Sequence, residues 1–236
     1  MPRVLQEIIA SKKAGQKLLA VLIDPEKFDP HNAKEFLRKI PFLTTHILIG
    51  GSTVAAEDLE VCVQAIKEQT DLPVILFPGD YRQISDSADA LLFLSLLSGR
   101  NPEYLITQQV KAVPLIRKTS LEIIPTAYLL IDGGKECAVE KVSGTQPLSQ
   151  NNISEIVDTA MAGFYAGKKL IYLEAGSGAL NPVSSDIISA VKETVDIPII
   201  VGGGIRSSKQ LSLAYEAGAN MVVIGTAFEN GDFFSL

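Results

Sequence analysis

Eight short apolar runs, most of them ending in glycine or a polar residue, recur along this chain of 236 residues. They are rich in β-branched side chains and too short for helices, which is typical of strands buried on both faces of a parallel sheet. Each run is therefore interpreted as one strand. The predicted strands are residues 18–23, 46–49, 73–77, 90–93, 122–131, 170–173, 197–201 and 221–224.

Apolar residues at helical spacing fill most of the gaps between these runs, at residues 32–40, 55–70, 102–119, 153–166, 184–195 and 207–217. Eight strands in strict alternation with helices predict a closed (β/α)8 barrel, the TIM barrel, in a single domain spanning 1–236. The alternative is an open doubly wound sheet. The turn after the first strand, however, reads Asp-Pro-Glu-Lys and not the glycine-rich loop of a dinucleotide site.

One connection is too long for this pattern. Residues 132–147 separate the fifth strand from the next helix, and they begin with Asp-Gly-Gly. Such a turn between an apolar run and residues 137–142 predicts a hairpin-like insertion. Because a long βα connection lies on the catalytic face of a barrel, the insertion is expected to be a lid or a pocket wall. The alternative is an exposed ornament.

Glycines follow the last two strands and predict a phosphate site. Gly202, Gly203 and Gly204 end the seventh strand, and Gly225 ends the eighth. Glycine lets main-chain N–H groups approach an anion closely, and the N-terminus of the next helix adds partial positive charge. In (β/α)8 barrels these two loops commonly form such a site. The alternative is that the glycines only make tight turns.

Composition narrows the choice of partners. Hydrophobic residues make up 47% of the chain and aromatic residues only 6%, which favours buried parallel strands over an antiparallel sandwich. The net charge of −6 argues against a nucleic-acid binder, which needs a basic face. Two cysteines indicate neither a disulfide framework nor a zinc site. Because neither a signal peptide nor a membrane span is evident, a soluble, cytoplasmic protein is expected.

Two carboxylates directly follow apolar runs and should project over the barrel mouth. Asp24, with the hydroxyls of Ser52 or Thr53, offers hard oxygen ligands suited to Mg²⁺. The alternative for Asp24 and for Ser52 is a helix N-cap. Glu174 stands beside a glycine-rich loop, where it can bind substrate hydroxyls or accept a proton. Its alternative is an ion pair with a neighbouring lysine.

Other catalytic constellations are missing from the strand ends. The two histidines, His31 and His46, lie in a loop-to-helix segment and at a strand start, away from the expected active face. The strand interiors contain no lysine that could form a Schiff base. Both observations weaken the aldolase and hydrolase interpretations.

The strand-end motifs resemble those of a known family. Asp-Pro-Glu-Lys at 24–27, Leu-Ile-Gly-Gly-Ser at 48–52 and Tyr-Leu-Glu-Ala-Gly-Ser-Gly at 172–178 precede the two glycine motifs at 201–205 and 224–226. In this order they are similar to the geranylgeranylglyceryl phosphate synthase and heptaprenylglyceryl phosphate synthase family. The resemblance covers residues 18–230, and its 172–178 motif is specific. Leu22 stands where some members have lysine, as in the family's second subgroup.

The resemblance implies a modified barrel without a regular third helix, in agreement with the short polar stretch 81–87. It also implies an Mg²⁺-dependent prenyltransferase that joins a prenyl diphosphate, geranylgeranyl diphosphate first among them, to the 3-hydroxyl of sn-glycerol 1-phosphate. This is the first step of ether-lipid assembly, and the product is a membrane lipid precursor. The family resemblance further implies a homo-oligomer, either a dimer or a hexamer.

The same resemblance assigns roles to individual residues. Asp24 and Ser52 would hold Mg²⁺, and Glu174 would accept the proton. An apolar groove would take the prenyl tail, with contributions from Leu92, Phe93, Leu94, Leu96, Leu97 and Tyr128. The sn-glycerol 1-phosphate site would consist of Tyr172, Leu173, Glu174, Ala175, Gly176, Ser177, Gly178, Gly203, Gly204, Gly225 and Thr226.

Two other functions compete with prenyl transfer. One is a phosphosugar isomerase or lyase of the phosphate-binding barrels, which needs an acid/base pair across the barrel. The other is a non-catalytic protein that binds a phosphate metabolite. Turnover of an allylic diphosphate would separate prenyl transfer from both.

Overall fold

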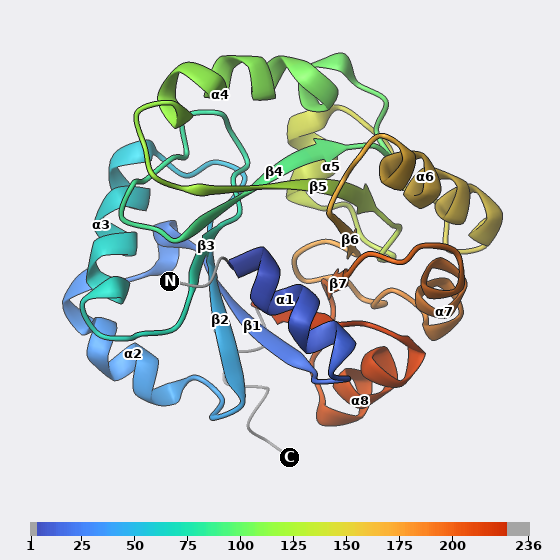
Figure 1. Ribbon diagram of the computed structural model, residues 1–236, viewed down its shortest axis with the longest axis horizontal. Coiled ribbons are helices and arrows are strands. Elements are labelled where there is room, and N and C mark those ends of the chain that lie inside the picture. Colours follow the sequence, from blue (N-terminus) through green and yellow to red (C-terminus); the bar gives the residue numbers. More distant parts are fainter. Residues whose placement is uncertain (1–3, 226–236) are drawn as a thin grey trace.

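The computed structural model describes residues 4–225, which form a closed barrel of eight parallel strands in sequence order (Figure 1). The barrel predicted from the sequence is confirmed, and the longest strands are β4 and β5. β3 is shorter than predicted. The strands are β1 (Leu18–Ile23), β2 (Thr44–Ile49), β3 (Val74–Leu76), β4 (Ala90–Leu96), β5 (Glu122–Leu130), β6 (Leu170–Glu174), β7 (Ile199–Gly202) and β8 (Met221–Ile224).

Helices surround the barrel, and α1 lies across one of its ends (Figure 1). The helices are α1 (Val4–Lys13), α2 (Ala33–Lys39), α3 (Ala56–Lys67), α4 (Gln108–Ile116), α5 (Ala138–Ser143), α6 (Ile153–Tyr165), α7 (Ser185–Thr194) and α8 (Ser208–Ala217). Short turns η1 (Pro25–Lys27) and η2 (Pro30–Asn32) follow β1, and the π-helical turn η3 (Glu103–Thr107) leads into α4. Within the described part of the chain, no helix is both long and apolar enough to cross a membrane.

The core has two layers because successive strand side chains point to opposite faces. On β6, Ile171 and Leu173 pack outward between the barrel and the helices. Leu170 and Tyr172 belong to the inner cluster that fills the barrel. By the same alternation, Glu174 at the end of β6 faces inward. The strand pattern thus decides which strand-end side chains reach a central site.

Residues 77–89, between β3 and β4, contain no helix. This confirms the expectation that the barrel has no regular third helix. Polar contacts hold this connection instead. Both Asp89 oxygens accept from Lys67 Nζ at 2.9 Å, and Oδ2 also accepts from the Val74 N–H. Earlier in the same segment, Gln83 donates to the carbonyls of Gly51 and Val54. The segment is therefore tied to the loop after β2 without a helix.

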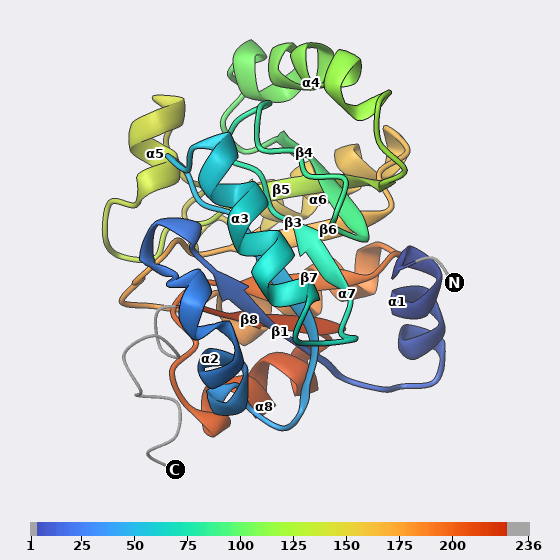
Figure 2. The same cartoon turned by 90° about the vertical axis from the view of Figure 1, so that its left-hand side faces the viewer.

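The insertion after β5 is not the predicted hairpin. It contains helix α5, which begins in a reciprocal capping box between Cys137 and Glu140 and ends at Gly144 with φ +61°. The Asp-Gly-Gly turn suggested a hairpin, but a glutamate three residues after the N-cap favours a helix start. α5 lies at the opposite end of the barrel from α1 (Figure 2). It is therefore on the side of the strand carboxyl ends.

Acid destabilisation is expected from His46, which is buried in β2. Burial lowers the pKa of His46 to about 4, below its ordinary 6.5, and its Nε2 has no partner in the described residues. Because the unfolded chain binds the proton more tightly, the histidine lowers stability progressively from about pH 6.5 down to pH 4. Between pH 7 and pH 5 we expect it to remove about 2 kcal/mol from the free energy of unfolding.

Urea unfolding of the wild type and of His46→Leu at both pH values measures this effect. The pH-dependent loss should be smaller in the variant by that amount, since leucine cannot titrate. Equal losses in the two proteins would contradict the assignment.

Candidate active site

A cavity of about 450 Å³ opens at the carboxyl ends of the strands. Its wall is drawn from the loops after most of the strands and from helix α5. The lining residues important for the chemistry are Asp24, Ser52, Phe77, Tyr128, Tyr172, Glu174, Gly176, Ser177, Gly178, Gly203, Gly204, Arg206 and Gly225. The structure therefore brings together site residues that lie up to 201 positions apart in the sequence.

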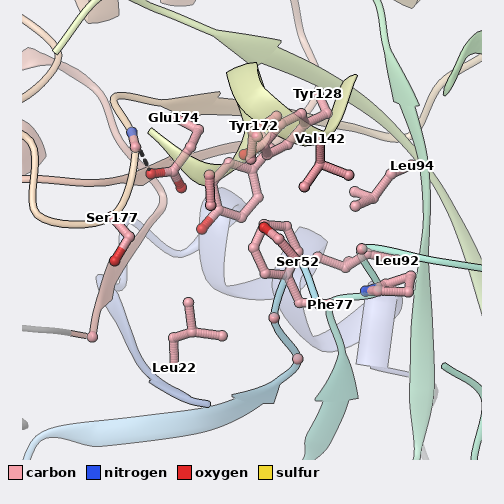
Figure 3. Close-up of a pocket in the computed structure, with 18 of the residues that line it drawn as sticks. Leu22, Ser52, Phe77, Leu92, Leu94, Tyr128, Val142, Tyr172, Glu174 and Ser177 are labelled. Carbon is pink, nitrogen blue, oxygen red and sulfur yellow. Dashed lines mark hydrogen bonds between the residues drawn. The ribbon is translucent and has the colours of Figure 1, made fainter. Parts of the chain in front are cut away.

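The cavity is polar at one end and apolar at the other (Figure 3). Glu174 and Ser177 lie on one side, and Leu92, Leu94 and Val142 lie on the opposite side. The rings of Tyr172 and Phe77 stand between them (Figure 3). A ligand with a charged or hydroxylated head and a hydrocarbon tail fits this division.

Glu174 is buried, with 7% of its surface exposed. Its Oε1 accepts a 2.7 Å hydrogen bond from the Gly176 N–H (Figure 3). Burial raises the pKa of Glu174 to about 7, and the Gly176 hydrogen bond opposes part of that rise. Within residues 4–225 it forms no ion pair with a lysine, so that alternative is wrong. A carboxyl group that titrates near neutral pH is suited to accept a proton.

Three aromatic rings form one wall beside this carboxylate. Phe77 stacks on Tyr172 with ring centroids 5.1 Å apart and planes 8° apart. Tyr128 is tilted against both, at 5.8 Å from Phe77 and 5.4 Å from Tyr172. The Tyr172 hydroxyl is buried without a hydrogen-bond partner among the described residues. A buried hydroxyl that lacks a partner is typical of a site completed by a ligand.

Glycines with left-handed backbone line the end of the cavity where phosphate binding was predicted. Gly176 and Gly178 have φ of +96° and +70°, and Gly203 and Gly204 have +83° and +74°. The two loops are in close contact, since a Cβ on Gly203 would lie 2.7 Å from the Gly176 nitrogen. Only glycine permits this approach. The interpretation that these residues merely make turns leaves their convergence on one cavity unexplained.

The other predicted glycerol phosphate residues divide into three groups. Tyr172, Ser177 and Gly225 line the cavity. The side chains of Leu173 and Ala175 point outward and pack in the outer core. Thr226 lies outside the described residues.

The predicted metal residues, Asp24 and Ser52, both line the cavity. Asp24 is also a helix cap, because its Oδ1 accepts from the Glu26 N–H at 3.1 Å, and its Oδ2 lies 3.2 Å from Lys27 Nζ. Ser52 is not a cap, since Ala55 occupies that position of α3. Within the part of the chain that the structure describes, no three His, Cys, Asp or Glu side chains gather as a metal site. A cation here would need ligand oxygens from a substrate.

Most of the predicted apolar groove is present, with one exception. Leu92, Phe93, Leu94, Leu96 and Tyr128 line the cavity. Leu97 does not, because alternation along the chain turns it outward against the outer core. Sequence reasoning also missed Phe77, Val139, Val142, Tyr104 and Arg206 as lining residues. The capping box of α5 is the signal that could have placed Val139 and Val142 on a helix at the mouth.

The fold and the glycine-lined loops place the protein among the phosphate-binding (β/α)8 barrels. More narrowly, the chain belongs to the PcrB family, whose model matches residues 12–234.

Individual relatives agree with this assignment. The chain is 59% identical over 233 residues to a geranylgeranylglyceryl phosphate synthase from Zunongwangia profunda, covering 99% of this chain and 100% of that relative. It is 41% identical to the enzyme of the same name from Pyrococcus furiosus, covering 96% and 90%. Among solved structures, (S)-3-O-geranylgeranylglyceryl phosphate synthase from Thermoplasma acidophilum, in complex with its substrate sn-glycerol-1-phosphate, superposes with a TM-score of 0.88. The two sequences are 36% identical, and the superposition covers 97% of this chain and 92% of the Thermoplasma acidophilum chain.

Glu174 should lower the stability of the fold at alkaline pH. Its pKa is raised in the folded protein, so the penalty grows from the unfolded pKa of about 4.5 up to pH 7 and remains above it. We expect Glu174→Gln to be more stable than the wild type by about 3 kcal/mol at pH 8 and by less than about 1 kcal/mol at pH 5. Chemical unfolding at the two pH values measures the difference. Glu35→Gln, at an exposed position, is the control, and a variant less stable at pH 8 would contradict the expectation.

Proposed function

We propose that the protein is a prenyltransferase that joins geranylgeranyl diphosphate to the 3-hydroxyl of sn-glycerol 1-phosphate. The single observation that carries the proposal is the arrangement of one cavity. Glu174 and the Tyr172 hydroxyl lie beside glycine-lined loops at one end, and an aliphatic groove occupies the other. The names of the relatives and the bound substrate of the Thermoplasma acidophilum structure support the same reaction.

The acceptor site follows from groups that converge on the polar end. The glycine loops would hold the phosphate, because their backbone admits an anion without side-chain interference. A Cβ on Gly202 would lie 2.6 Å from both Glu174 Oε2 and the Tyr172 hydroxyl oxygen, so these two polar groups face the same point. Glycerol hydroxyls placed there would satisfy the unpartnered tyrosine hydroxyl and meet the carboxylate.

In the reaction, the 3-hydroxyl oxygen forms a bond to the first carbon of the prenyl chain. The bond from that carbon to the diphosphate oxygen breaks, and the diphosphate leaves with the electron pair. Glu174 accepts the hydroxyl proton, for which a pKa of about 7 is well suited. The aliphatic wall excludes water, and the two bound substrates are held in a fixed orientation.

A magnesium ion fits the donor set at Asp24 and Ser52. Mg²⁺ binds through one or two carboxylates together with substrate phosphates, and Asp24 and Glu26 supply carboxylates to this part of the cavity. When bound, such an ion offsets charge on a leaving diphosphate. Asp24 Oδ2 lies 3.2 Å from Lys27 Nζ, so an ion bound at this carboxylate would take the place of that contact.

The competing functions have weaker support. An isomerase or lyase needs a second acid/base group opposite Glu174, but Asp24 is engaged with the Glu26 N–H and with Lys27. A metabolite-binding protein would not require an aliphatic groove continuous with the polar end.

Product mass from a panel of prenyl diphosphates incubated with sn-glycerol 1-phosphate and Mg²⁺ tests the proposal. We expect an ether product, with the geranylgeranyl donor among those accepted. No product from any donor would overturn prenyl transfer. We also propose that the protein is a dimer or a hexamer, which light scattering would test. Cell fractionation would test the proposed cytoplasmic location.

Loss of the proton acceptor should slow turnover. Glu174→Gln keeps the shape and the Gly176 hydrogen bond but cannot take a proton. General-base catalysis contributes about 10²–10⁴-fold, so we expect a fall in kcat within that range and little change in prenyl diphosphate affinity. The wild-type rate should rise with pH through about 7, and that rise should vanish in the variant. A loss below about tenfold would mean that Glu174 only positions glycerol.

Removing the Asp24 charge should weaken the metal-dependent step. Asp24→Asn substitutes a neutral and poorer ligand, so most Mg²⁺-dependent turnover should disappear at limiting Mg²⁺. Asp29→Asn is a matched control, because Asp29 caps η2 through an equivalent bond to the His31 N–H but lies outside the cavity lining. Rates near those of the wild type in Asp24→Asn would exclude the metal role.

A side chain on Gly225 should block the phosphate end. A Cβ there would meet Leu22 at 3.6 Å, an ordinary contact, so Gly225→Val tests the site with less strain than Gly204→Val, where φ is +74°. We expect the KM for glycerol phosphate to rise far more than the KM for the prenyl donor. Steady-state kinetics with each substrate varied in turn gives both values. Equal rises would indicate general damage to the barrel.

A further inference from the structure

Arg206 joins the two glycine-rich loops of the phosphate end. It follows β7 and lines the cavity. Its Nη2 donates to the Gly178 carbonyl at 3.2 Å and to the Ala179 carbonyl, both in the loop after β6. Its own N–H donates to Gln210 Oε1 at 2.8 Å, which anchors the residue to the start of α8. Through its side chain and its backbone N–H together, Arg206 thus connects the β6 loop to the beginning of α8.

The carbonyls that Arg206 holds would otherwise oppose an anion. A carbonyl oxygen carries partial negative charge, and two of them beside a phosphate would repel it. In the same loop the Ala179 N–H is used in a turn to the Gly176 carbonyl at 3.1 Å. The Gly178 N–H has no partner among residues 4–225. The guanidinium therefore binds the two carbonyl oxygens that would repel an anion. The Gly178 N–H remains available to donate to that anion.

The charge of Arg206 is not cancelled within the described residues, because no carboxylate there pairs with it. Lys135, in the connection after β5, places a second cation beside this loop, since a Cβ on Gly178 would lie 3.9 Å from its Nζ. Glu174 is the carboxyl group on the other side of the loop, and it is buried. The two cations stand beside the loop amides, in a chain whose net charge is −6.

We propose that Arg206 is a positioning residue for the acceptor phosphate, and that it acts by fixing the carbonyls of Gly178 and Ala179. This rests on the proposed function, because the ligand is the phosphate of sn-glycerol 1-phosphate. Arginine suits the task, since one guanidinium can serve two acceptors at once and keeps its charge at any working pH. The residue was not among those that the motifs indicated.

Calorimetric titration of sn-glycerol 1-phosphate, without donor, measures the effect directly. Arg206→Gln should weaken binding by about tenfold or more, the scale of a charge-assisted contact. In steady-state kinetics the KM for glycerol phosphate should rise in parallel. The KM for the prenyl donor and kcat should stay within about twofold, because Glu174 and the apolar groove are untouched. An affinity within about twofold of the wild type, or equal rises in both KM values, would overturn the proposal.

Two comparisons separate positioning from charge alone. Lys135→Gln removes a charge beside the same loop without touching the carbonyls, and it should weaken binding much less than Arg206→Gln. Arg206→Lys keeps the charge but loses the planar fork, and it should recover only part of the affinity. Full recovery with lysine, or equal losses in Lys135→Gln and Arg206→Gln, would mean that charge alone matters.

Arg38→Gln on α2 is the remote control, because Arg38 is exposed and pairs with Glu35 outside the cavity. Its affinity should match the wild type. Failure of the proposed function gives a different result. In that case the wild type itself would not bind sn-glycerol 1-phosphate, whereas failure of the Arg206 proposal leaves the wild type binding normally and the variant equally tight.

Discussion

A buried carboxyl group without a counter-ion in the described chain is the constraint around which the mouth of this barrel is arranged. Glu174 lies at the inward-facing end of β6, held by one amide hydrogen bond. Its oxygens and the Tyr172 hydroxyl occupy the space where β7 ends, so a Cβ on Gly202 would lie 2.6 Å from Glu174 Oε2, and one on Gly203 would lie 2.5 Å from Oε1. The glycines at the end of β7 are thus required by the close approach of the carboxylate, apart from the phosphate-binding role proposed for them. One packing requirement therefore shapes both the carboxylate and the glycine loop beside it.

The division of the cavity into polar and apolar ends follows from strand alternation and from the missing helix after β3. Residues 77–89 form no helix, and residues of β4, α4 and α5 line the apolar part of the cavity on this side. Phe77 stands at the boundary, stacked on Tyr172. Two chemically different substrates can therefore share one cavity, each in the part that suits it.

The sequence predicted the barrel well because buried parallel strands have a clear local signature. It predicted the strand-end residues for the same reason, since topology brings all the strand ends to one rim. It failed where a local signal had two meanings. The Asp-Gly-Gly turn suggested a hairpin, yet Glu140 completes the cap of a helix. Leu97 is as apolar as Leu96, and only its direction keeps it out of the cavity. Contacts between distant loops, such as Arg206 with Ala179, have no local pattern and could not be predicted.

The barrel encloses two titratable groups whose pKa values are shifted in opposite directions by burial. His46 lies on the same inward-facing side of β2 as Leu48, towards the amino ends of the strands, and is uncharged with a pKa of about 4. Glu174 lies at the carboxyl ends with a pKa of about 7. At mildly acid pH, unfolding lets the histidine take up a proton and makes the carboxyl group release one. The two exchanges cancel, so in this range the contribution of the barrel interior to unfolding is nearly independent of pH. In mild acid the Glu174 carboxyl group stays protonated and the His46 ring at the opposite end of the barrel stays neutral. Their contributions to the pH dependence of the unfolding free energy therefore offset each other.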